Sequence, residues 1–335
     1  MVGKIIAFGG LVVIVMPMVL LAAEMVRFGR GKAWARKQFE NDRAEKFRNW
    51  GATERLEILP LIDWYAAKEG LLTEGGVSYL LKTDTRTILF DLGFNYPARS
   101  HPSPLLQNMA RLGIRLDDID TIVISHDHPD HVGGRKWQAR KSFSLSSTQV
   151  DLGGTAVYTP VPMTYPGLQP VVTEAPTRIG EGIATIGTIP NQLFMAGWTV
   201  EQALAVNVAG KGVVLIVGCG HQTLPRILER TEALFDEPIY GVVGGLHYPV
   251  SDSRIKPLGF KIQKYLGTGK VPWQPITRQE VFENIACLQK RHPRLVGLSP
   301  HDSCDESLDA FRTAFPQAYR DIRVGEAICV SRGTG

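Results

Sequence analysis

The hydrophobic pattern changes twice along the chain. Residues 5–23 form a run without any charged residue. From about residue 55, short apolar runs are separated by Gly, Pro, Asp and His, which is typical of strands and turns. After about residue 210, apolar runs of strand length alternate with segments of helix length. The pattern therefore has strands in its first part and strands alternating with helices in its later part. This order predicts one α/β domain over residues 55–335, with sheets covered by helices.

Local signals place individual elements within this pattern. Ser103 followed by Pro104 predicts a helix start, because Ser caps the free N–H groups of the first turn and Pro fits the first helical position. Thr277 and Glu280 form a T-x-x-E capping box, which predicts a second helix start at Thr277. The predicted strands are residues 77–83, 85–93, 119–125, 213–218, 239–245 and 294–299, and a further helix begins near Leu224.

The uncharged run at residues 5–23 is long enough to cross a membrane. A helix of this length spans a hydrocarbon layer of about 30 Å, and glycines and Pro17 are tolerated in membrane helices. A cleaved signal peptide or a buried helix is the alternative. The run is longer than a usual secretory core, and residues 21–23 are a poor cleavage site. We therefore expect a transmembrane anchor at residues 1–23, with membrane lipid as its partner.

Basic residues are concentrated after this run. Residues 1–50 carry nine Lys and Arg against four acidic residues, whereas the other 285 residues have a net charge of −1. Because positive flanks stay in the cytoplasm, we expect a single-pass protein of the cell membrane with a cytoplasmic domain. Residues 24–54 are expected to form a linker or helix, in solvent or against anionic headgroups. Residues 51–335 have no excess of basic residues, which does not favour nucleic acid as a partner.

Histidines collect where the predicted strands end. Loops at one end of a sheet are held rigidly and can bring distant side chains to one point. The histidines in such loops are His126, His128, His131, His221, His247 and His301. His101 and His292 lie elsewhere and are expected on the surface.

Residues 126–131 read HDHPDH and are the strongest local signal. Neutral imidazole and carboxylate are ligands that zinc and similar metals prefer. His126 and His128 can face one ion from an extended turn, and Asp130 with His131 can face a second. The alternative is a polar loop with incidental histidines, but the histidines that end distant strands favour a metal site.

These motifs resemble the metallo-β-lactamase superfamily. H-x-H-x-D-H follows an apolar strand and an earlier F-D-x-G, and GCGH (218–221), VVGGLH (242–247) and a late strand before His301 follow in the family's order over residues 55–330. They are similar to the branch named for archaeal dihydropterin-methyl-ribofuranosylaminobenzene-phosphate synthase. The resemblance implies an αββα sandwich with a metal site at one edge of its two sheets.

The resemblance also implies roles for single residues. The implied metal ligands form two sets: His126, His128 and His221 for one ion, and Asp130, His131 and His301 for a second. Asp91 would hydrogen-bond and orient them. We expect Zn²⁺, as one or two ions, with iron or manganese as alternatives. The family often has an aspartate that bridges the ions, whereas the corresponding strand here ends at His247.

Three residues near these motifs have several interpretations. His247 is interpreted as a proton donor to the leaving group, and a metal ligand or a buried structural histidine are the alternatives. Cys219 and Cys304 each lie within three residues of an implied ligand. For both, packing in a tight turn is favoured over thiolate ligation or redox sensing. The four cysteines show no disulfide-framework spacing, which fits a reducing compartment.

Residues 249–276 are basic and aromatic, which suits a flap over an anionic, phosphate-bearing substrate. Lys256, Lys261 and Lys264 are the candidate substrate contacts. The alternative is a solvated insertion, or one resting on a membrane.

Together these residues predict a membrane-anchored, metal-dependent hydrolase of a phosphoester or phosphodiester. A metal-bound hydroxide would attack, Asp130 would orient it and His247 would protonate the leaving group. The alternatives are an iron-dependent thiol or sulfur dioxygenase on the same fold and a non-catalytic, metal-stabilised binding protein. Hydrolysis of β-lactams is not favoured, because a family does not fix a substrate.

Overall fold

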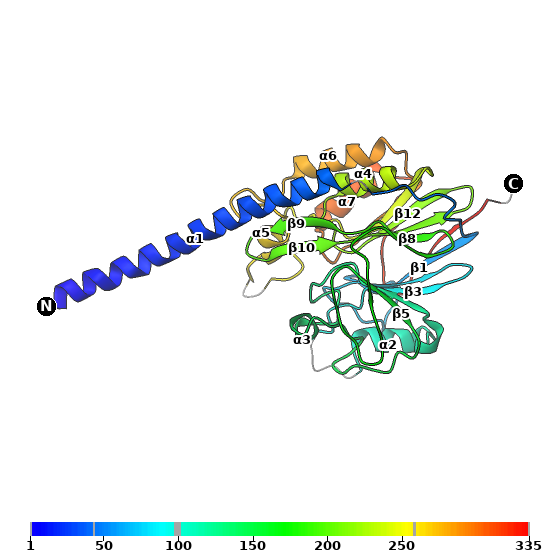
Figure 1. Ribbon diagram of the computed structural model, residues 1–335, viewed down its shortest axis with the longest axis horizontal. Helices are drawn as coiled ribbons and strands as arrows, with labels where there is room; N and C mark the ends of the chain where they lie inside the picture. The colour runs from blue at the N-terminus through cyan, green and yellow to red at the C-terminus, as the bar shows by residue number, and fades with distance from the viewer. Residues whose placement is uncertain (1, 43, 97–101, 257–258, 334–335) are drawn as a thin grey trace.

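The computed structural model describes residues 2–42, 44–96, 102–256 and 259–333, and for residues 2–15 it describes the backbone alone. Two β-sheets lie face to face, helices cover their outer faces, and a long first helix leaves the body at one side (Figure 1). This is the predicted αββα sandwich.

The first sheet has the strand order β15-β1-β2-β3-β4-β5-β6. Its strands are β1 (Arg55–Ile62), β2 (Ser78–Lys82), β3 (Thr87–Phe90), β4 (Thr121–Val123), β5 (Ala156–Thr159), β6 (Val171–Val172) and β15 (Ile328–Ser331). β2 and β3 pair antiparallel as the predicted hairpin, and β3, β4, β5 and β6 pair parallel.

The second sheet has the order β14-β13-β12-β11-β8-β7, and a separate hairpin pairs β9 with β10. The strands are β7 (Thr177–Gly180), β8 (Ile183–Thr185), β9 (Ile189–Leu193), β10 (Gly197–Glu201), β11 (Leu204–Val208), β12 (Gly212–Val217), β13 (Ile239–Gly244) and β14 (Leu295–Leu298). β12, β13 and β14 run parallel. The predicted strands at 213–218, 239–245 and 294–299 are therefore confirmed.

Helices cover each sheet on its outer face (Figure 1). α2 (Pro104–Arg111) and α3 (Arg135–Ala139) lie on the first sheet, with the short 3-10 helix η1 (Leu116–Asp118) after α2. α4 (Leu224–Leu234), α6 (Arg278–Gln289) and α7 (Asp305–Ala314) lie on the second sheet, and α5 (Ile262–Leu266) lies in the segment before α6. Both predicted caps are present: Ser103 Oγ accepts from Leu106 N–H, and Thr277 forms the capping box with Glu280.

The sequence of β12 shows how the layers are held together. Its residues are apolar without alternation and are all buried, as expected of a parallel strand covered on both faces. Val213, Leu215 and Val217 pack toward the helices, whereas Val214 and Ile216 pack into the core between the two sheets.

α1 (Val2–Asn41) includes most of the predicted linker and packs against the β9–β10 hairpin. Phe28 contacts Phe194 edge-on at 5.6 Å between ring centroids, and Trp34 contacts Trp198 at 4.6 Å. Within the described residues, no helix combines the length and apolarity needed to cross a membrane. The predicted transmembrane helix is thus not supported by the structure, and side chains 5–15 of that run lie outside the description.

Candidate metal centre

Strand ends from both sheets meet at one edge of the sandwich. In the first sheet Asp91 follows β3, and His126 lies in the loop after β4. In the second sheet residues 219–221 follow β12, His247 follows β13 and His301 follows β14. Contacts between these loops, given below, show that parts of the chain more than 150 residues apart form one buried cluster.

The loop after β4 turns tightly because a glycine follows its last histidine. Gly133 has φ +84°, and a Cβ atom there would lie 1.8 Å from the carbonyl oxygen of Ser144. No other residue fits this position without moving the backbone. His131 N–H donates to the carbonyl of His128 at 3.0 Å, which closes the turn.

The first donor group consists of His126, His128 and His221. One ring nitrogen of each lies within 4.8 Å of the others. The His128 Nδ1 and His221 Nε2 atoms are 3.1 Å apart. The structure therefore brings together the set that the resemblance implied for one ion, with His128 turned to present Nδ1.

The hydrogen-bond network leaves lone pairs facing the centre of this group. Ser125 Oγ donates to Asp91 Oδ2 at 2.6 Å, so His126 Nδ1–H donates to Ser125 Oγ at 2.9 Å. His126 Nε2 is then a buried acceptor with no hydrogen-bond partner. His221 Nδ1–H donates to the Gly267 carbonyl at 2.9 Å, which frees its Nε2. Burial lowers the pKa of His126 and His221 well below the ordinary value, so both rings are neutral.

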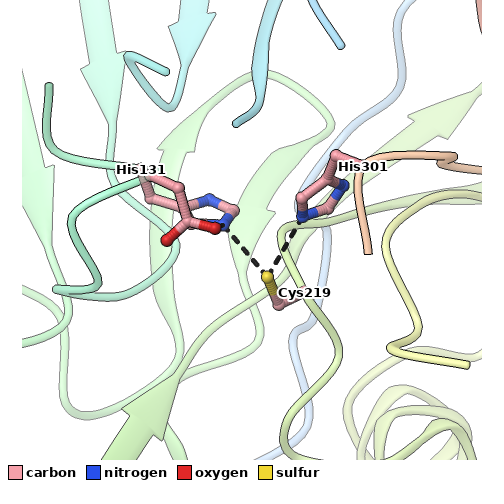
Figure 2. Close-up of side chains that lie close together, drawn as sticks. His131, Cys219 and His301 are labelled. Carbon is pink, nitrogen blue, oxygen red and sulfur yellow. Dashed lines mark hydrogen bonds and ion pairs between the residues drawn. The ribbon is translucent and has the colours of Figure 1, made fainter. Parts of the chain in front are cut away.

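The second donor group consists of Asp130, His131, Cys219 and His301, whose ligand atoms also lie within 4.8 Å of one another. Cys219 Sγ is 3.1 Å from His131 Nε2 and 3.2 Å from His301 Nε2, and Figure 2 shows the sulfur between the two rings. Asp130 Oδ2 is 3.7 Å from His131 Nε2. The three residues implied for a second ion are thus together, with a sulfur among them.

Asp91 links the two groups. Its Oδ1 accepts from Ser125 N–H at 2.7 Å, and its Oδ2 accepts from His131 Nδ1–H at 2.7 Å. Burial opposes protonation of His131, but the carboxylates of Asp91 and Asp130 outweigh it and raise its pKa to about 9. Asp91 itself has φ +57°, an uncommon backbone conformation for a residue other than glycine. Asp91 thus contacts His131 directly and His126 through Ser125, and the orienting role that the resemblance implied for it stays a prediction.

Two buried carboxylates that the sequence analysis missed support the ligand loops. Glu201, at the end of β10, accepts the N–H groups of Cys219, Gly220 and His221 at 2.7–2.9 Å. Burial raises its pKa to about 7. Like Asp91, Glu201 follows a run of strand residues, and this position is the signal that could have identified it.

Asp63 has the same role on the other side of the cluster. It follows β1, and its Oδ2 accepts from the hydroxyl groups of Ser299 (2.6 Å) and Tyr79 (2.7 Å). Ser299 Oγ in turn accepts from His301 Nδ1–H at 2.6 Å. Burial raises the pKa of Asp63 to about 6. The chain Asp63–Ser299–His301 thereby fixes the ring of His301 with Nε2 facing the sulfur.

His247 lies beside the first group with its ring centroid 4.9 Å from that of His221. Its Nε2 faces the Gln263 carbonyl at 3.3 Å, and its buried Nδ1 has no partner. Burial lowers its pKa to about 4, so the ring is neutral at neutral pH. A free Nδ1 lone pair favours an acceptor or ligand role over proton donation, and its catalytic role stays a prediction.

The basic segment 249–276 reaches the cluster through its backbone. The Gln263 and Gly267 carbonyls contact the rings of His247 and His221. The predicted substrate contacts lie elsewhere: Lys256 pairs with Asp252 at 2.5 Å, Lys261 donates to the Ser251 carbonyl at 2.7 Å, and Lys264 lies over the ring of Tyr265. Their binding of substrate stays a prediction.

A cavity opens beside the first donor group. Its lining includes Gly220, His221, His247 and Thr268, and also Lys270. Lys270, which pairs with Glu280, is the ammonium group of the basic segment that lines this cavity. Of the two other histidines, His292 is exposed as predicted, and His101 lies outside the described residues.

Comparisons with known proteins agree with this geometry. Residues 72–141 match the family model of the metallo-beta-lactamase superfamily. The 7,8-dihydropterin-6-methyl-4-(beta-D-ribofuranosyl)-aminobenzene-5'-phosphate synthase of Methanocaldococcus jannaschii is 24% identical over 265 residues, which cover 67% of this chain and 88% of that protein. A transcription termination factor, FttA, of Cenarchaeum symbiosum is 44% identical over 54 residues, which cover 16% of this chain and 8% of that protein.

A solved structure shares the whole domain. The crystal structure of a metal-dependent hydrolase of the beta-lactamase superfamily superposes with a TM-score of 0.54 and 22% identity, covering 83% of this chain and 100% of that one. The chain therefore has the metallo-β-lactamase fold, and the resemblance to this superfamily that its motifs indicated is confirmed.

Proposed function

We propose that the protein is a metal-dependent hydrolase of a small anionic phosphoester or phosphodiester. One observation carries the hydrolase part of the proposal: His126 Nε2 is a buried acceptor without a partner, and it faces the ring nitrogens of His128 and His221. Buried polar atoms are costly unless they are bonded, and a divalent metal satisfies three converging lone pairs at once.

The donors fit such a metal. Three neutral imidazoles with a position left for water or substrate are the ligand set of catalytic zinc sites. When bound, a divalent metal supplies a hydroxide nucleophile at neutral pH and stabilises negative charge that develops on oxygen. His126, His128 and His221 would hold the first ion, and Asp130, His131 and His301 the second.

The chain's own residues complete the chemistry. The Asp130 carboxylate lies with His131 and His301 in the second donor group and would orient the attacking water and accept its proton. Asp91 and Glu201 keep the ring of His131 and the loop 219–221 in place. The enclosing carbonyls of Gln263 and Gly267 shield one side of the cluster from water.

The substrate class is proposed from charge. Lys270 lines the cavity beside His221 together with Glu280 and Glu283, so the cavity lining by itself has no positive surplus. The charge argument rests on the segment 249–276, which carries five Lys and Arg residues against one Asp, and such a segment favours an anionic substrate. Attachment to a membrane stays a prediction of the sequence.

The test combines metal analysis with turnover. The full chain is purified without added metal, its metal content is measured, and hydrolysis of bis(p-nitrophenyl) phosphate is followed with added Zn²⁺, Mn²⁺ or Fe²⁺. We expect His126→Ala to lower turnover by at least about 100-fold with an unchanged circular dichroism spectrum. His292→Ala, an exposed histidine, is the matched control and should keep full turnover.

Two results would contradict the proposal. Metal-dependent turnover that survives His126→Ala excludes the first donor group as its site. Tightly bound iron together with oxygen consumption on thiols, and no hydrolysis, would favour the dioxygenase that the sequence left as an alternative.

A further inference from the structure

We propose that the cavity beside the first donor group binds the uncharged organic part of the substrate, a ring that carries hydrogen-bond donors and acceptors. The hydroxyl groups of Tyr248 and Thr268 would hold this ring. The inference rests on the proposed function, because it assumes that the phosphoester group of the same molecule lies at the metal centre.

The cavity adjoins the metal centre and has the size of a small ring. It is lined by the start of α4, the loop after β13, the segment 249–276 and α6, and both His221 and His247 belong to its lining. Its volume is about 260 Å³. In other proteins a cavity of about 150 Å³ binds benzene, and pockets for drug-sized ligands begin at about 300 Å³. The space therefore suits one substituted ring system.

The lining favours an uncharged group over an anion. Part of the wall is apolar and consists of Leu224, Pro225, Leu246 and Ile276. The charged residues of the lining are Lys270, which pairs with Glu280, and Glu283. Because two carboxylates outnumber one ammonium group, the cavity does not attract a phosphate. We therefore place the phosphate of the substrate at the donor groups and its uncharged part in the cavity.

Tyr248 contributes a buried hydroxyl group to the residues that line the cavity. Its ring stacks on Phe311 with the centroids 5.7 Å apart, and its N–H donates to Ser303 Oγ at 3.1 Å, so the residue is held firmly. Tyr248 is 3% exposed, and its hydroxyl has no hydrogen-bond partner among the described residues. Burial raises the pKa of Tyr248, so the hydroxyl keeps its proton and can donate. A ligand that bonds this hydroxyl would remove the cost of leaving it unpaired.

Thr268 contributes a second hydroxyl group from the segment 249–276. Its Oγ1 is also buried and has no hydrogen-bond partner within the part of the chain that the structure describes. Glycines on both sides fix its position: Gly269 has φ +66°, and a Cβ atom at Gly267 would lie 2.0 Å from His247 Nε2. The Gly267 carbonyl accepts from His221 Nδ1–H at 2.9 Å. Thr268 is thereby held one residue from a direct contact with the first donor group.

The two hydroxyl groups define the chemistry of the ligand. Each can donate one hydrogen bond and accept others, so a ring with both acceptors and donors satisfies them. An alkyl group of the same size would leave both hydroxyl groups unpaired. A site that hydrogen-bonds part of its substrate rejects analogues that lack this part. We therefore expect the enzyme to prefer phosphodiesters with a polar ring over those with an alkyl group.

The test compares two phosphodiesters that release the same chromophore. Thymidine 5'-(p-nitrophenyl) phosphate carries an uncharged base and sugar, and methyl p-nitrophenyl phosphate carries neither. We expect the metal-loaded wild type to have a kcat/KM at least about 10-fold higher for the thymidine ester. Tyr248→Phe and Thr268→Val should each reduce this preference by about 3- to 10-fold, because each removes one hydrogen bond to the ligand.

Thermal melts of the metal-free variants separate binding from a structural role. Because the Tyr248 hydroxyl has no partner among the described residues, Tyr248→Phe should keep the Tm of the wild type. Tyr165→Phe is the matched control, since this hydroxyl donates to the Val150 carbonyl at 2.7 Å and belongs to an apolar cluster of the first sheet. It should lower the Tm and leave the substrate preference unchanged.

The outcomes separate this inference from the proposed function. If the wild type hydrolyses both esters equally well, or if both cavity variants keep its preference, the cavity does not bind the organic part and the hydrolase proposal stands. If neither ester is hydrolysed, the hydrolase proposal fails, and saturation-transfer NMR with thymidine decides on the cavity. Binding that Tyr248→Phe weakens supports the cavity as a binding site, whereas no binding, or binding that this variant keeps, overturns it.

Discussion

The two donor groups share one edge of the sandwich but differ in charge and in origin. The first consists of three imidazoles, two of them from one loop, and carries no negative charge. The second combines a carboxylate, a thiol and two imidazoles from three separate loops. A neutral set leaves the positive charge of an ion available to activate water, whereas an anionic set neutralises it. If the proposed hydrolase binds both ions, we expect the ion of the first group to activate water and the ion of the second group to have a supporting role.

The largest effect should separate the two groups directly. We expect His221→Ala to lower metal-dependent turnover by at least about 100-fold, and His301→Ala to weaken the second ion while lowering turnover less. Steady-state kinetics with metal titrations of both variants measures the difference. Equal losses in the two variants would show that both ions share the chemistry and would remove the distinction between the groups.

A smaller effect should fall on both groups together. Glu201 holds the backbone of Cys219 and of His221, so Glu201→Gln should weaken binding of either ion and lower the stability of the protein by about 1–3 kcal/mol. Thermal melts and metal titrations of the variant measure these two quantities. A loss confined to one ion would contradict the view that one carboxylate supports both groups.

The same residue gives a pH dependence. The pKa of Glu201 is about 7 in the folded protein and near 4.5 when exposed. Between these values the folded protein keeps a proton that the unfolded chain has released. The stability from this group is therefore present below about pH 4.5 and lost as the pH rises to about 7. Urea unfolding of the metal-free protein should show this decline, and Glu201→Gln should reduce it. An identical pH profile in the variant would exclude Glu201 as its source.

The smallest expected effect comes from a substitution in α1, outside the sandwich, and should change the first donor group alone. Lys32 on α1 donates to Asn191 Oδ1 at 2.8 Å, and Asn191 Nδ2 donates to the carbonyl of His221. Lys32→Met should lower turnover by less than about 10-fold and leave the second ion unaffected. Lys37→Met, at an exposed position of the same helix, is the control. Weaker binding of the second ion in Lys32→Met would argue against this separate connection.

The sequence predicted features that depend on neighbouring residues, and it did not predict contacts between distant segments. The first donor group could be predicted because its HDHPDH motif is local and His221 follows an apolar strand of its own. The caps at Ser103 and Thr277 could be predicted because they depend on neighbouring residues only. The contacts of Cys219, Glu201 and Asp63 could not be predicted. Each depends on contacts between segments that only the folded chain brings together: Cys219 with His131, Glu201 with the loop 219–221, and Asp63 with Ser299.

The contacts of the first helix could not be predicted for a related reason. Its charges and apolar run indicated a membrane span followed by a linker or helix, but nothing in the pattern indicated that Phe28 and Trp34 have aromatic partners in the β9–β10 hairpin. The pattern of apolar residues in a helix indicates that one face of the helix is buried, but it does not identify the segment that packs against that face.

The contact of α1 with the β9–β10 hairpin also bears on how the protein is prepared in the laboratory. A shortened version that begins at the first strand, the usual choice for recombinant expression, would remove Phe28, Lys32 and Trp34 together. The aromatic surface of Phe194 and Trp198 would then face water, and Asn191 would lose Lys32, its partner beside the backbone of His221, a proposed ligand. Such a fragment is expected to aggregate and to bind metal poorly. Low activity of the fragment would then result from the truncation and would not be a property of the full chain.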